Sequence, residues 1–298
     1  MKILVTGSSG LVGTALVPYL QKHGHQVVRV VRQVGDDKDA IVWNPEKGTY
    51  RLEDFEGFDA AINLAGDNIF SSLRWSDEKK KKIMSSRVDA ARTLCACFER
   101  LQSPPKVLIN ASAIGYYGSQ GAAVVNEDSA AGAGFLADVC REWEAAADEA
   151  QKLGIRVVRL RLGVVLSPEG GALGKMLLPF KLGLGGVVGS GQQYMSWITL
   201  DDLLSVILFA LTNNSLQGPV NAVTDNPVTN AEWTKTLGGV LQRPTFLPVP
   251  AFALRLIMGE VADEVLLSST RVMPTRLQHA GFRFAYPKLE GALHHLLG

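Results

Sequence analysis

Cysteine is scarce in this chain of 298 residues. Only Cys95, Cys97 and Cys140 are present, and their spacing contains no C-x-x-C motif. An odd, sparse set of this kind argues against a disulfide framework and is typical of reduced thiols in a cytosolic protein. We therefore expect a cytoplasmic location.

Long apolar runs and an excess of one charge are also missing. No segment has the length of a membrane span, and the formal net charge is +1, so neither a membrane nor nucleic acid is the expected partner. The first expected strand begins at Lys2, which leaves no room for a signal peptide. The histidines lack metal-ligand spacing and no G-x-S-x-G motif occurs, so we expect no metal site and no hydrolase. A small-molecule substrate is the expected partner.

The clearest positive signal is a glycine motif directly after a short apolar strand. The strand Lys2–Thr6 leads into the sequence Gly7-Ser8-Ser9-Gly10-Leu11-Val12-Gly13. In this spacing the first glycine allows a sharp turn, the second lets a pyrophosphate approach the backbone, and the third lets the helix pack on the strand. The free N–H groups of the first helical turn would then face the phosphates. The motif predicts dinucleotide binding by residues 6–13, and the alternative is a glycine-rich turn without a ligand.

Strands and helices alternate through the first half of the chain. We expect strands at Lys2–Thr6, Gln26–Val31, Ile41–Trp43, Ala60–Leu64, Val107–Ala111 and Arg156–Leu160, with helices from Leu11 to about Gly24 and from Phe135 to Leu153. Pro18 should bend the first helix. This alternation predicts an α/β, Rossmann-like, doubly wound parallel sheet. We expect a dinucleotide-binding domain over residues 1–167, with a returning strand near 218–224, and a smaller substrate-side and C-terminal lobe over 168–298. Within that lobe, the run from Thr229 to Glu232 predicts a helix-capping box.

The end of the second strand indicates which dinucleotide is bound. An acid about 20 residues past the glycine motif would bond the ribose 2′-hydroxyl of NAD. This chain instead has Arg32 there, and no acid occurs until Asp36. A guanidinium can bind a 2′-phosphate through two parallel hydrogen bonds, whereas a carboxylate would repel it. We therefore predict NADP as cofactor, with NAD as the alternative.

Several further motifs resemble the extended short-chain dehydrogenase/reductase superfamily, in its epimerase/dehydratase branch. They are Asn63-Leu64-Ala65-Gly66, Ala111-Ser112-Ala113-Ile114-Gly115-Tyr116-Tyr117-Gly118, Arg161-Leu162-Gly163-Val164-Val165-Leu166 and Trp197-Ile198-Thr199-Leu200-Asp201-Asp202-Leu203. Two more runs, 178–186 and 280–284, resemble the group usually labelled only "epimerase family protein" (YfcH-like). The resemblance implies an NADP-binding oxidoreductase or epimerase-like protein that acts on a nucleotide sugar or a small carbonyl compound. It also implies cofactor contacts beyond the glycine motif and Arg32, at Leu64, Ala65, Gly66, Asn68, Ala111, Ser112, Leu162, Gly163 and Val164.

The chain departs from that superfamily at its acid/base pair, a Tyr with a Lys four residues later. Phe135 or Leu136 stands at the Tyr position, and Val139 or Cys140 at the Lys position. Tyr116 and Tyr117 are the best substitute acids, because they follow the fifth strand towards the expected nicotinamide end, and Ser112 could orient a substrate oxygen. The alternative function is a catalytically silent NADP-binding sensor or scaffold.

The remaining candidates concern the substrate side and the helix surfaces. Residues that could line a substrate cleft are Arg74, Trp75, Gln193, Tyr194 and Trp197. Ser86-Arg87 and Glu142 and Glu144 lie on expected helices, and we expect them to face solvent.

Overall fold

An eight-stranded sheet forms the centre of the molecule. The computed structural model describes residues 1–33 and 39–298, so Asp36 lies outside the described residues. The spatial order of the sheet is β12 (Gly218–Ala222), β8 (Arg156–Leu162), β6 (Val107–Ala113), β5 (Ala60–Asn63), β1 (Lys2–Thr6), β2 (Gln26–Val31), β3 (Ile41–Asn44) and β4 (Thr49–Tyr50). All neighbouring pairs are parallel except β3 and β4, which are antiparallel. The predicted doubly wound α/β sheet is therefore confirmed, and the chain reverses its direction of winding between β1 and β5.

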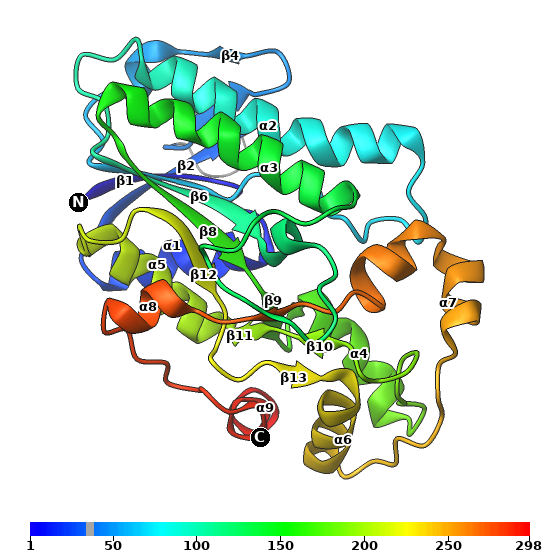
Figure 1. Cartoon of the computed structure of the whole chain (residues 1–298). Coiled ribbons are helices and arrows are strands. Elements are labelled where there is room, and N and C mark those ends of the chain that lie inside the picture. Colours follow the sequence, from blue (N-terminus) through cyan, green and yellow to red (C-terminus); the bar gives the residue numbers. More distant parts are fainter. Residues whose placement is uncertain (34–38) are drawn as a thin grey trace.

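Helices cover both faces of this sheet (Figure 1). On one face α2 (Asp77–Phe98) and α3 (Phe135–Asp148) pack in an apolar core that includes Leu94, Phe98 and Trp143. On the other face α1 (Leu11–Lys22) and α5 (Leu200–Thr212) pack in a second core that includes Leu16 and Leu203. The sheet is thus buried on both sides, as parallel sheets are.

The helix boundaries follow from local capping signals. Ser76 accepts a hydrogen bond from the Lys79 backbone N–H at 3.1 Å and begins α2, and Asp77 and Glu78 complement the helix dipole. Thr229 and Glu232 form the predicted capping box at the start of α6 (Asn230–Leu241). Pro18 lies inside α1, which nevertheless is one helix from Leu11 to Lys22.

A third apolar core lies beyond the carboxyl ends of the strands. It packs Leu173 of α4 (Gly171–Lys181), Trp233 of α6 and Leu293 of α9 (Leu289–Leu297) around Trp197. Two two-stranded ladders accompany it: β9 (Val164–Ser167) with β11 (Trp197–Thr199), and β10 (Tyr194–Met195) with β13 (Val228–Thr229). A further ladder, β7 (Val124–Val125) with β14 (Arg271–Val272), packs in a separate small cluster with Tyr117.

Shorter elements complete the chain. The remaining α-helices are α7 (Ala251–Met258) and α8 (Thr275–His279), the 3₁₀ helices are η1 (Leu52–Phe55), η2 (Ile114–Tyr117) and η3 (Glu149–Leu153), and η4 (Ala262–Leu266) is a π-helix. Figure 1 shows α7 at the outer edge of the molecule, beside the segment that precedes α2. Among the described residues no helix combines the length and apolar character needed to span a membrane.

Candidate active site

The glycine turn between β1 and α1 has no room for a side chain at its first and third glycines. Gly7 has φ +66°, and a Cβ there would lie 2.4 Å from the Leu64 carbonyl oxygen. A Cβ on Gly13 would lie 2.4 Å from the Gly7 oxygen, whereas Gly10 faces open space apart from one contact at 3.5 Å. No side chain caps the N-terminus of α1, and no acid lies in its first turn. This geometry leaves the first N–H groups of α1 available to a diphosphate.

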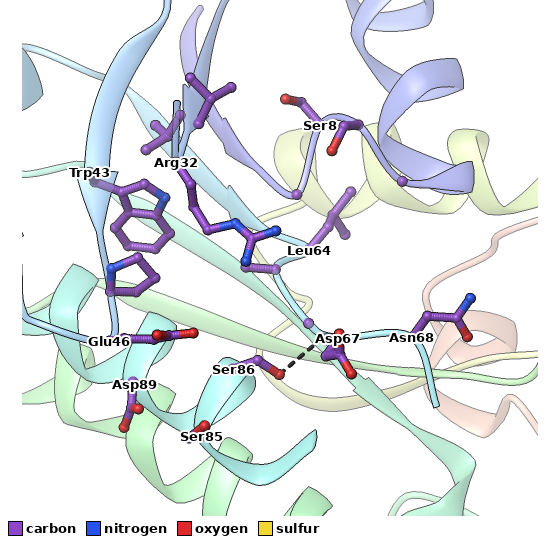
Figure 2. A pocket seen from close by; sticks show the side chains of 18 of the residues that line it. Ser8, Arg32, Trp43, Glu46, Leu64, Asp67, Asn68, Ser85, Ser86 and Asp89 are labelled. Atoms are coloured by element: carbon purple, nitrogen blue, oxygen red, sulfur yellow. Dashed lines mark hydrogen bonds between the residues drawn. The ribbon is translucent and has the colours of Figure 1, made fainter. Parts of the chain in front are cut away.

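A pocket of about 340 Å³ opens directly above this turn (Figure 2). Of the cofactor residues expected from the sequence, it is lined by Gly7, Ser8, Ser9, Gly10, Arg32, Leu64, Ala65, Gly66 and Asn68. It is also lined by residues that were not expected to contact the cofactor: Val30, Val31, Trp43, Pro45, Glu46, Asp67, Lys82, Ser85, Ser86 and Asp89. The second group comes from the end of β2, from β3 and the segment after it, from the turn after β5 and from one face of α2, which come together only in the fold.

Charges of both signs line this pocket at different places. Arg32, exposed at the end of β2, extends its guanidinium between Trp43 and Leu64, while Glu46 and Asp89 lie near one end and Asn68 near the other (Figure 2). Arg29 of β2 donates from Nε to the Ser8 hydroxyl at 3.1 Å and so ties the strand to the glycine turn. The cationic groups and the bare N–H groups suit a phosphorylated ligand.

The other expected cofactor residues lie outside the lining of this pocket. Thr6 is fully buried and donates its hydroxyl to the Asn63 side chain at 2.6 Å. The remaining ones are Leu11, Val12 and Gly13 in α1, Ala111 and Ser112 in β6, and the segment Leu162, Gly163 and Val164 at the β8–β9 junction. Gly163 is enclosed, because a Cβ there would lie 2.7 Å from the Ser196 carbonyl oxygen.

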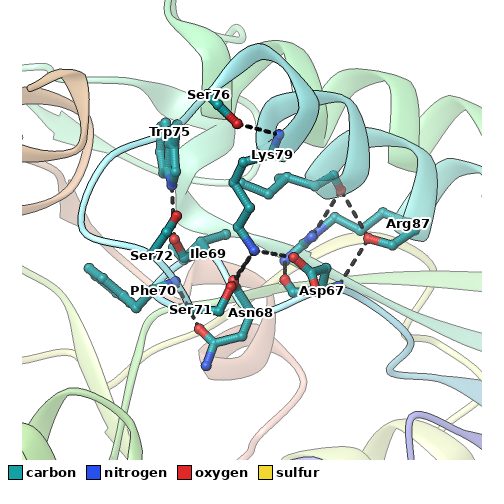
Figure 3. A network of polar contacts seen from close by, with 12 residues as sticks. Asp67, Asn68, Ile69, Phe70, Ser71, Ser72, Trp75, Ser76, Lys79 and Arg87 are labelled. Atoms are coloured by element: carbon teal, nitrogen blue, oxygen red, sulfur yellow. Dashed lines mark hydrogen bonds and ion pairs between the residues drawn. The ribbon is translucent and has the colours of Figure 1, made fainter.

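A polar network around Lys79 fixes the segment that borders the pocket (Figure 3). The Lys79 ammonium donates to the Asn68 carbonyl at 2.7 Å and the Ser71 hydroxyl at 2.5 Å, and forms an ion pair with Asp67. The Asp67 backbone N–H in turn donates to the Ser86 hydroxyl at 2.9 Å. One lysine of α2 therefore holds residues 67–71 against the helix.

Arg87 lies behind the same turn, and it is not the solvent-facing residue expected from the sequence. Its guanidinium donates to the carbonyls of Ile83 at 2.9 Å and Asp67 at 3.0 Å, and lies 5.3 Å from the Trp143 ring centroid. A Cβ on Gly66 would lie 3.2 Å from the Arg87 Cζ. Burial lowers the Arg87 pKa. Within residues 1–33 and 39–298 Arg87 forms no salt bridge, although the charge of nearby Asp67 acts against the effect of burial on its pKa. A half-buried cation therefore adjoins the pocket.

The expected catalytic residues belong to a second, fully buried network at the end of β6. Ser112 donates its hydroxyl to Glu144 Oε1 at 2.7 Å, and Glu144 is held by Arg161 through two hydrogen bonds of 2.8 Å. Burial by itself would lower the Arg161 pKa, but the hydrogen bonds and charge of Glu144 raise it. Glu144 is therefore a buried ion-pair partner, contrary to the expectation of an exposed position, whereas Glu142 is exposed as expected.

Tyr117 is also part of this network, and its surroundings disfavour proton transfer. Its hydroxyl accepts from Arg161 at 2.9 Å and donates to Asn221 at 2.8 Å. Burial raises the Tyr117 pKa to about 12, although Arg161 acts in the opposite direction. A fully enclosed phenol with a raised pKa is a poor acid or base near neutral pH.

Tyr116 differs from its neighbour because it is only half-buried. Its ring centroid lies 3.4 Å from the Arg161 Cζ, a cation–π stack, and the ring meets Tyr117 edge-on at 5.4 Å. Of the candidate acids, Tyr116 is thus the one that retains access to a ligand.

Of the α3 residues considered for the Tyr and Lys positions of the superfamily pair, two lie close to the end of β6. A Cβ on Gly115 would lie 3.3 Å from the Leu136 Cβ and 3.8 Å from the Cys140 Sγ. Leu136 and Cys140, four residues apart, therefore face the end of β6. Burial raises the Cys140 pKa to about 11, and the charge of Arg87 partly opposes that rise. The thiol of Cys140 and the isobutyl group of Leu136 therefore lie near the end of β6, and neither is suited to exchange a proton near neutral pH.

The five expected substrate residues are not brought together. Arg74 donates to the carbonyls of Leu256 and Ile257 at the end of α7, and Trp75 packs edge-on against Phe135 at 5.3 Å. The Gln193 amide donates to two backbone carbonyls, Val188 at 2.9 Å and Leu266 at 3.3 Å.

Trp197 and Tyr194 lie in other surroundings. Trp197 is fully buried, with its indole N–H bonded to the Asn226 carbonyl at 2.9 Å, so the structure does not support a substrate contact by Trp197. Tyr194 is half-buried with Arg271 over its ring at 4.7 Å. Among the described residues no group of three His, Cys, Asp or Glu side chains is placed to hold a metal ion.

Comparison with known proteins defines the class to which this fold and site belong. The model of the NAD dependent epimerase/dehydratase family matches residues 3–222, and that of a domain of unknown function matches 249–296. The chain belongs to the NAD dependent epimerase/dehydratase family, within the extended short-chain dehydrogenases/reductases.

Its relatives fall in the group named "epimerase family protein". An Epimerase family protein of Mycobacterium tuberculosis is 44% identical over 291 residues, which cover 98% of this chain and 96% of the relative. Epimerase family protein SDR39U1 of Homo sapiens is 36% identical, with both chains covered completely. The crystal structure of the human protein with NADPH matches with a TM-score of 0.91, 36% identity and 99% of each chain. UDP-N-acetylglucosamine 4-epimerase from Bacillus cereus, at 18% identity and a TM-score of 0.76, shares the fold.

Proposed function

We propose that this protein binds NADP and acts as an oxidoreductase or epimerase-like enzyme on a nucleotide sugar or a small carbonyl compound. The observation that carries the proposal is the bare glycine turn opening onto a pocket that contains Arg32. The diphosphate would be bound by the first N–H groups of α1, and Arg32 would bind the 2′-phosphate. The NADPH in the human relative supports the choice of coenzyme.

The chemistry of the coenzyme would be hydride transfer at its nicotinamide ring. In this proposal the ring lies between the Ser112–Tyr117 segment and Gly163–Val164, at the carboxyl ends of β6 and β8. Tyr116 is the proposed proton donor, because it is half-buried and its ring stacks on Arg161. Ser112 and Tyr117 position the end of β6 through the buried Glu144–Arg161 pair.

A second candidate function is NADP binding without turnover, as a sensor or scaffold. It is favoured by Leu136 and Cys140 facing the end of β6, and by the burial of the Ser112 and Tyr117 hydroxyls in internal hydrogen bonds. The two functions share the coenzyme pocket and differ only in whether a proton donor reaches the substrate.

Titration calorimetry with NADP and NAD tests the coenzyme assignment. We expect tighter binding of NADP, and Arg32→Asp should reverse the preference because a carboxylate repels the 2′-phosphate. Arg51→Asp is the matched control, since Arg51 is an exposed arginine outside the pocket, paired only weakly with Asp54 at 3.9 Å. An Arg32→Asp variant with undiminished preference for NADP would refute the role of Arg32.

Oxidation of NADPH separates the two functions. Loss of NADPH absorbance with a panel of carbonyl compounds, or conversion of a nucleotide sugar to its epimer in the presence of NADP, supports the enzyme. Tyr116→Phe should then lower turnover while coenzyme affinity is unchanged. NADPH binding without turnover against the whole panel supports the sensor or scaffold.

A further inference from the structure

Arg271 of β14 has no polar partner in the part of the chain that the structure describes. Its side chain is half-buried, its Nε is enclosed without a hydrogen-bond acceptor, and among the described residues neither Nη group forms a hydrogen bond or a salt bridge. Arg159 and Arg161 of β8, in contrast, are paired with Asp148 and Glu144 at 2.9 and 2.8 Å. A guanidinium that is partly removed from water is stabilised by a negative charge, so Arg271 is suited to bind an anion.

The acidic residues that precede β14 all have other partners: Glu260 pairs with Lys80, Asp263 pairs with Arg255 at 2.9 Å, and Glu264 caps the N-terminus of α3. Of the nitrogen atoms of Arg271 only Nε is enclosed, so the two Nη groups reach solvent. They are therefore open to an acceptor that does not belong to the described residues.

The hydroxyl of Ser196 fixes the backbone around Arg271. Ser196 Oγ donates to the Thr270 carbonyl at 2.9 Å and accepts from the Val272 N–H at 2.9 Å, so it bonds to the residues on both sides of Arg271. The Ser196 carbonyl oxygen lies 2.7 Å from the position that a Cβ on Gly163 would take. Because the nicotinamide ring is proposed to lie beside Gly163, one serine joins the strand that carries Arg271 to that part of the site.

The same strand adjoins the surroundings of the proposed proton donor. Val272 packs in a small cluster with Tyr117, and Tyr116 packs against that cluster. Successive side chains of a strand point to opposite sides, so Arg271 points away from the cluster, and its guanidinium lies over the Tyr194 ring at 4.7 Å from the centroid. The ring holds the guanidinium while the in-plane N–H donors stay available. Arg271 thus supplies a cation one residue away from the cluster against which Tyr116 packs.

We propose that Arg271 binds a carboxylate or phosphate group of the substrate. The inference rests on the proposed function, since it concerns the compound that would react at the nicotinamide ring. The fork of guanidinium N–H donors matches the oxygens of a carboxylate or a phosphate, whereas a neutral compound offers no charge to the cation. The substrate is then a carbonyl compound or sugar derivative that carries an anionic group, with that group at Arg271 and the reacting carbon towards the nicotinamide ring.

Matched pairs of small aromatic probes test this assignment. Phenyl phosphate is compared with phenol, and benzoate with benzamide, by ligand-observed NMR titration of the protein saturated with NADP, which would occupy the glycine turn and Arg32. We expect at least one anion to bind about tenfold or more tightly than its neutral counterpart, because the counterpart lacks the hydrogen bond to a charged group. The pair with the larger difference identifies phosphate or carboxylate as the group that is recognised.

Arg271→Gln should abolish the preference for the anion, and Arg271→Lys should retain part of it because the charge remains. Arg283→Gln is the matched control and should keep the preference, since Arg283 is also half-buried but its neighbours Phe282 and Phe284 pack in the core beside α5. Coenzyme affinity should be unchanged in all three variants, which shows that they are folded. If Arg271→Gln does not fold, the weakened preference of Arg271→Lys decides the question.

The proposal is overturned if neither anion binds more tightly than its neutral counterpart, or if the preference survives unchanged in the Arg271 variants. An equal loss in Arg283→Gln would overturn it as well. Failure of the proposed function gives a different result: no compound is reduced or epimerised, although the preference for the anion and its dependence on Arg271 persist.

Discussion

Arg87 brings a half-buried positive charge to the back of the coenzyme pocket, and among the described residues it forms no salt bridge, although the charge of Asp67 acts on its pKa. A cation that is partly removed from water is stabilised by a further negative charge, which the diphosphate of a bound coenzyme would supply. We predict that Arg87→Gln weakens NADP binding by about tenfold or more, because a charge-assisted contribution of about 1.5–3 kcal/mol is lost. Arg87→Lys should retain part of the affinity. Titration calorimetry measures both.

The control for this prediction is Arg156. It is also half-buried, donates only to backbone carbonyls (those of Ala210, Leu211 and Leu216), and has a pKa lowered by burial. It lies at the first residue of β8, the opposite end of the strand from the site. Arg156→Gln should reduce thermal stability and leave coenzyme affinity unchanged. If Arg87→Gln behaves in the same way, Arg87 has only a structural role.

Tyr117 makes the stability of the protein depend on alkaline pH. Its pKa is about 12 in the folded state, against about 10 for a free tyrosine, because burial disfavours the phenolate. The folded state therefore holds the Tyr117 proton more tightly than the unfolded chain. Its contribution is fully present below pH 10 and is lost as the pH rises through 12, by up to about 2–3 kcal/mol. Urea unfolding of the wild type and Tyr117→Phe should show their free energies of unfolding converging over this range. A constant difference would contradict the prediction.

Single residues show where sequence reasoning succeeds and where it stops. The glycines of residues 7–13 were predictable because their role depends on the local backbone, and Arg32 because it directly follows β2. Glu144 and Arg161 were not, since the partner that buries Glu144 comes from a neighbouring strand. Arg87 was missed for the same reason: Gly66 and Trp143, which enclose it, are distant in the sequence. Contacts between residues that are distant in the sequence produce no local pattern from which they could be predicted.

At the scale of elements, the N-terminus of α3 depends on a residue from the far end of the chain. Glu264 of η4 accepts hydrogen bonds from the backbone N–H groups of Phe135 at 3.2 Å and Leu136 at 3.1 Å. Gly134 precedes the helix with φ +114°, and a Cβ there would lie 2.4 Å from Glu264 Oε1. The Glu264 cap therefore requires the glycine at position 134. Together they join the C-terminal segment to α3, the helix that faces the end of β6.

This unit leads to a prediction about two glycines. Gly134→Ala should destabilise the protein by about 1–3 kcal/mol, because the backbone is strained and the Glu264 cap is displaced. Gly239→Ala in α6 is the matched control, since a Cβ there meets nothing within 4 Å and helix propensity should improve stability by about 0.5–1 kcal/mol. Thermal unfolding of the two variants measures both effects. Equal and small shifts in Tm for the two variants would show that capping of α3 by Glu264 does not require a glycine at position 134.

The longer strands of the sheet were predictable and the two-residue strands were not. The expected strands at Lys2–Thr6 and Gln26–Val31 match β1 and β2 to the residue, because strands of a parallel sheet are rich in apolar, β-branched residues. The two-residue ladders, such as β7 with β14, join segments nearly 150 residues apart and depend on tertiary contacts alone. Pro18 removes one hydrogen-bond donor from α1, which is nevertheless one helix from Leu11 to Lys22, and the bend at Pro18 stays a prediction.

At the scale of the whole molecule, the C-terminal residues are fastened to the sheet domain at separate points. The Asp202 carboxylate of α5 accepts from the backbone N–H groups of Ala285 at 2.7 Å and Tyr286 at 3.0 Å. Arg74 reaches the end of α7, and Lys80 of α2 pairs with Glu260. The segment that borders the coenzyme pocket is thus connected to the C-terminal segment. A ligand that orders the pocket should therefore also stabilise the C-terminal segment.

Coenzyme binding should therefore stabilise the whole protein in one transition. A ligand that binds only the folded state adds about 2.7 kcal/mol at a hundredfold excess over its Kd, which for a chain of this size raises Tm by roughly 5 °C. We predict a rise of this order with NADPH and a smaller one with NADH at the same concentration, because only NADPH carries the 2′-phosphate that Arg32 would bind. Arg32→Asp should reverse the order of the two coenzymes, because a carboxylate repels the 2′-phosphate. Gly13→Ala should lower the effect of both, since a Cβ there would collide with the Gly7 carbonyl. A calorimetric scan that splits into two transitions, of which only one responds to NADPH, would contradict the coupling of the C-terminal segment to the pocket.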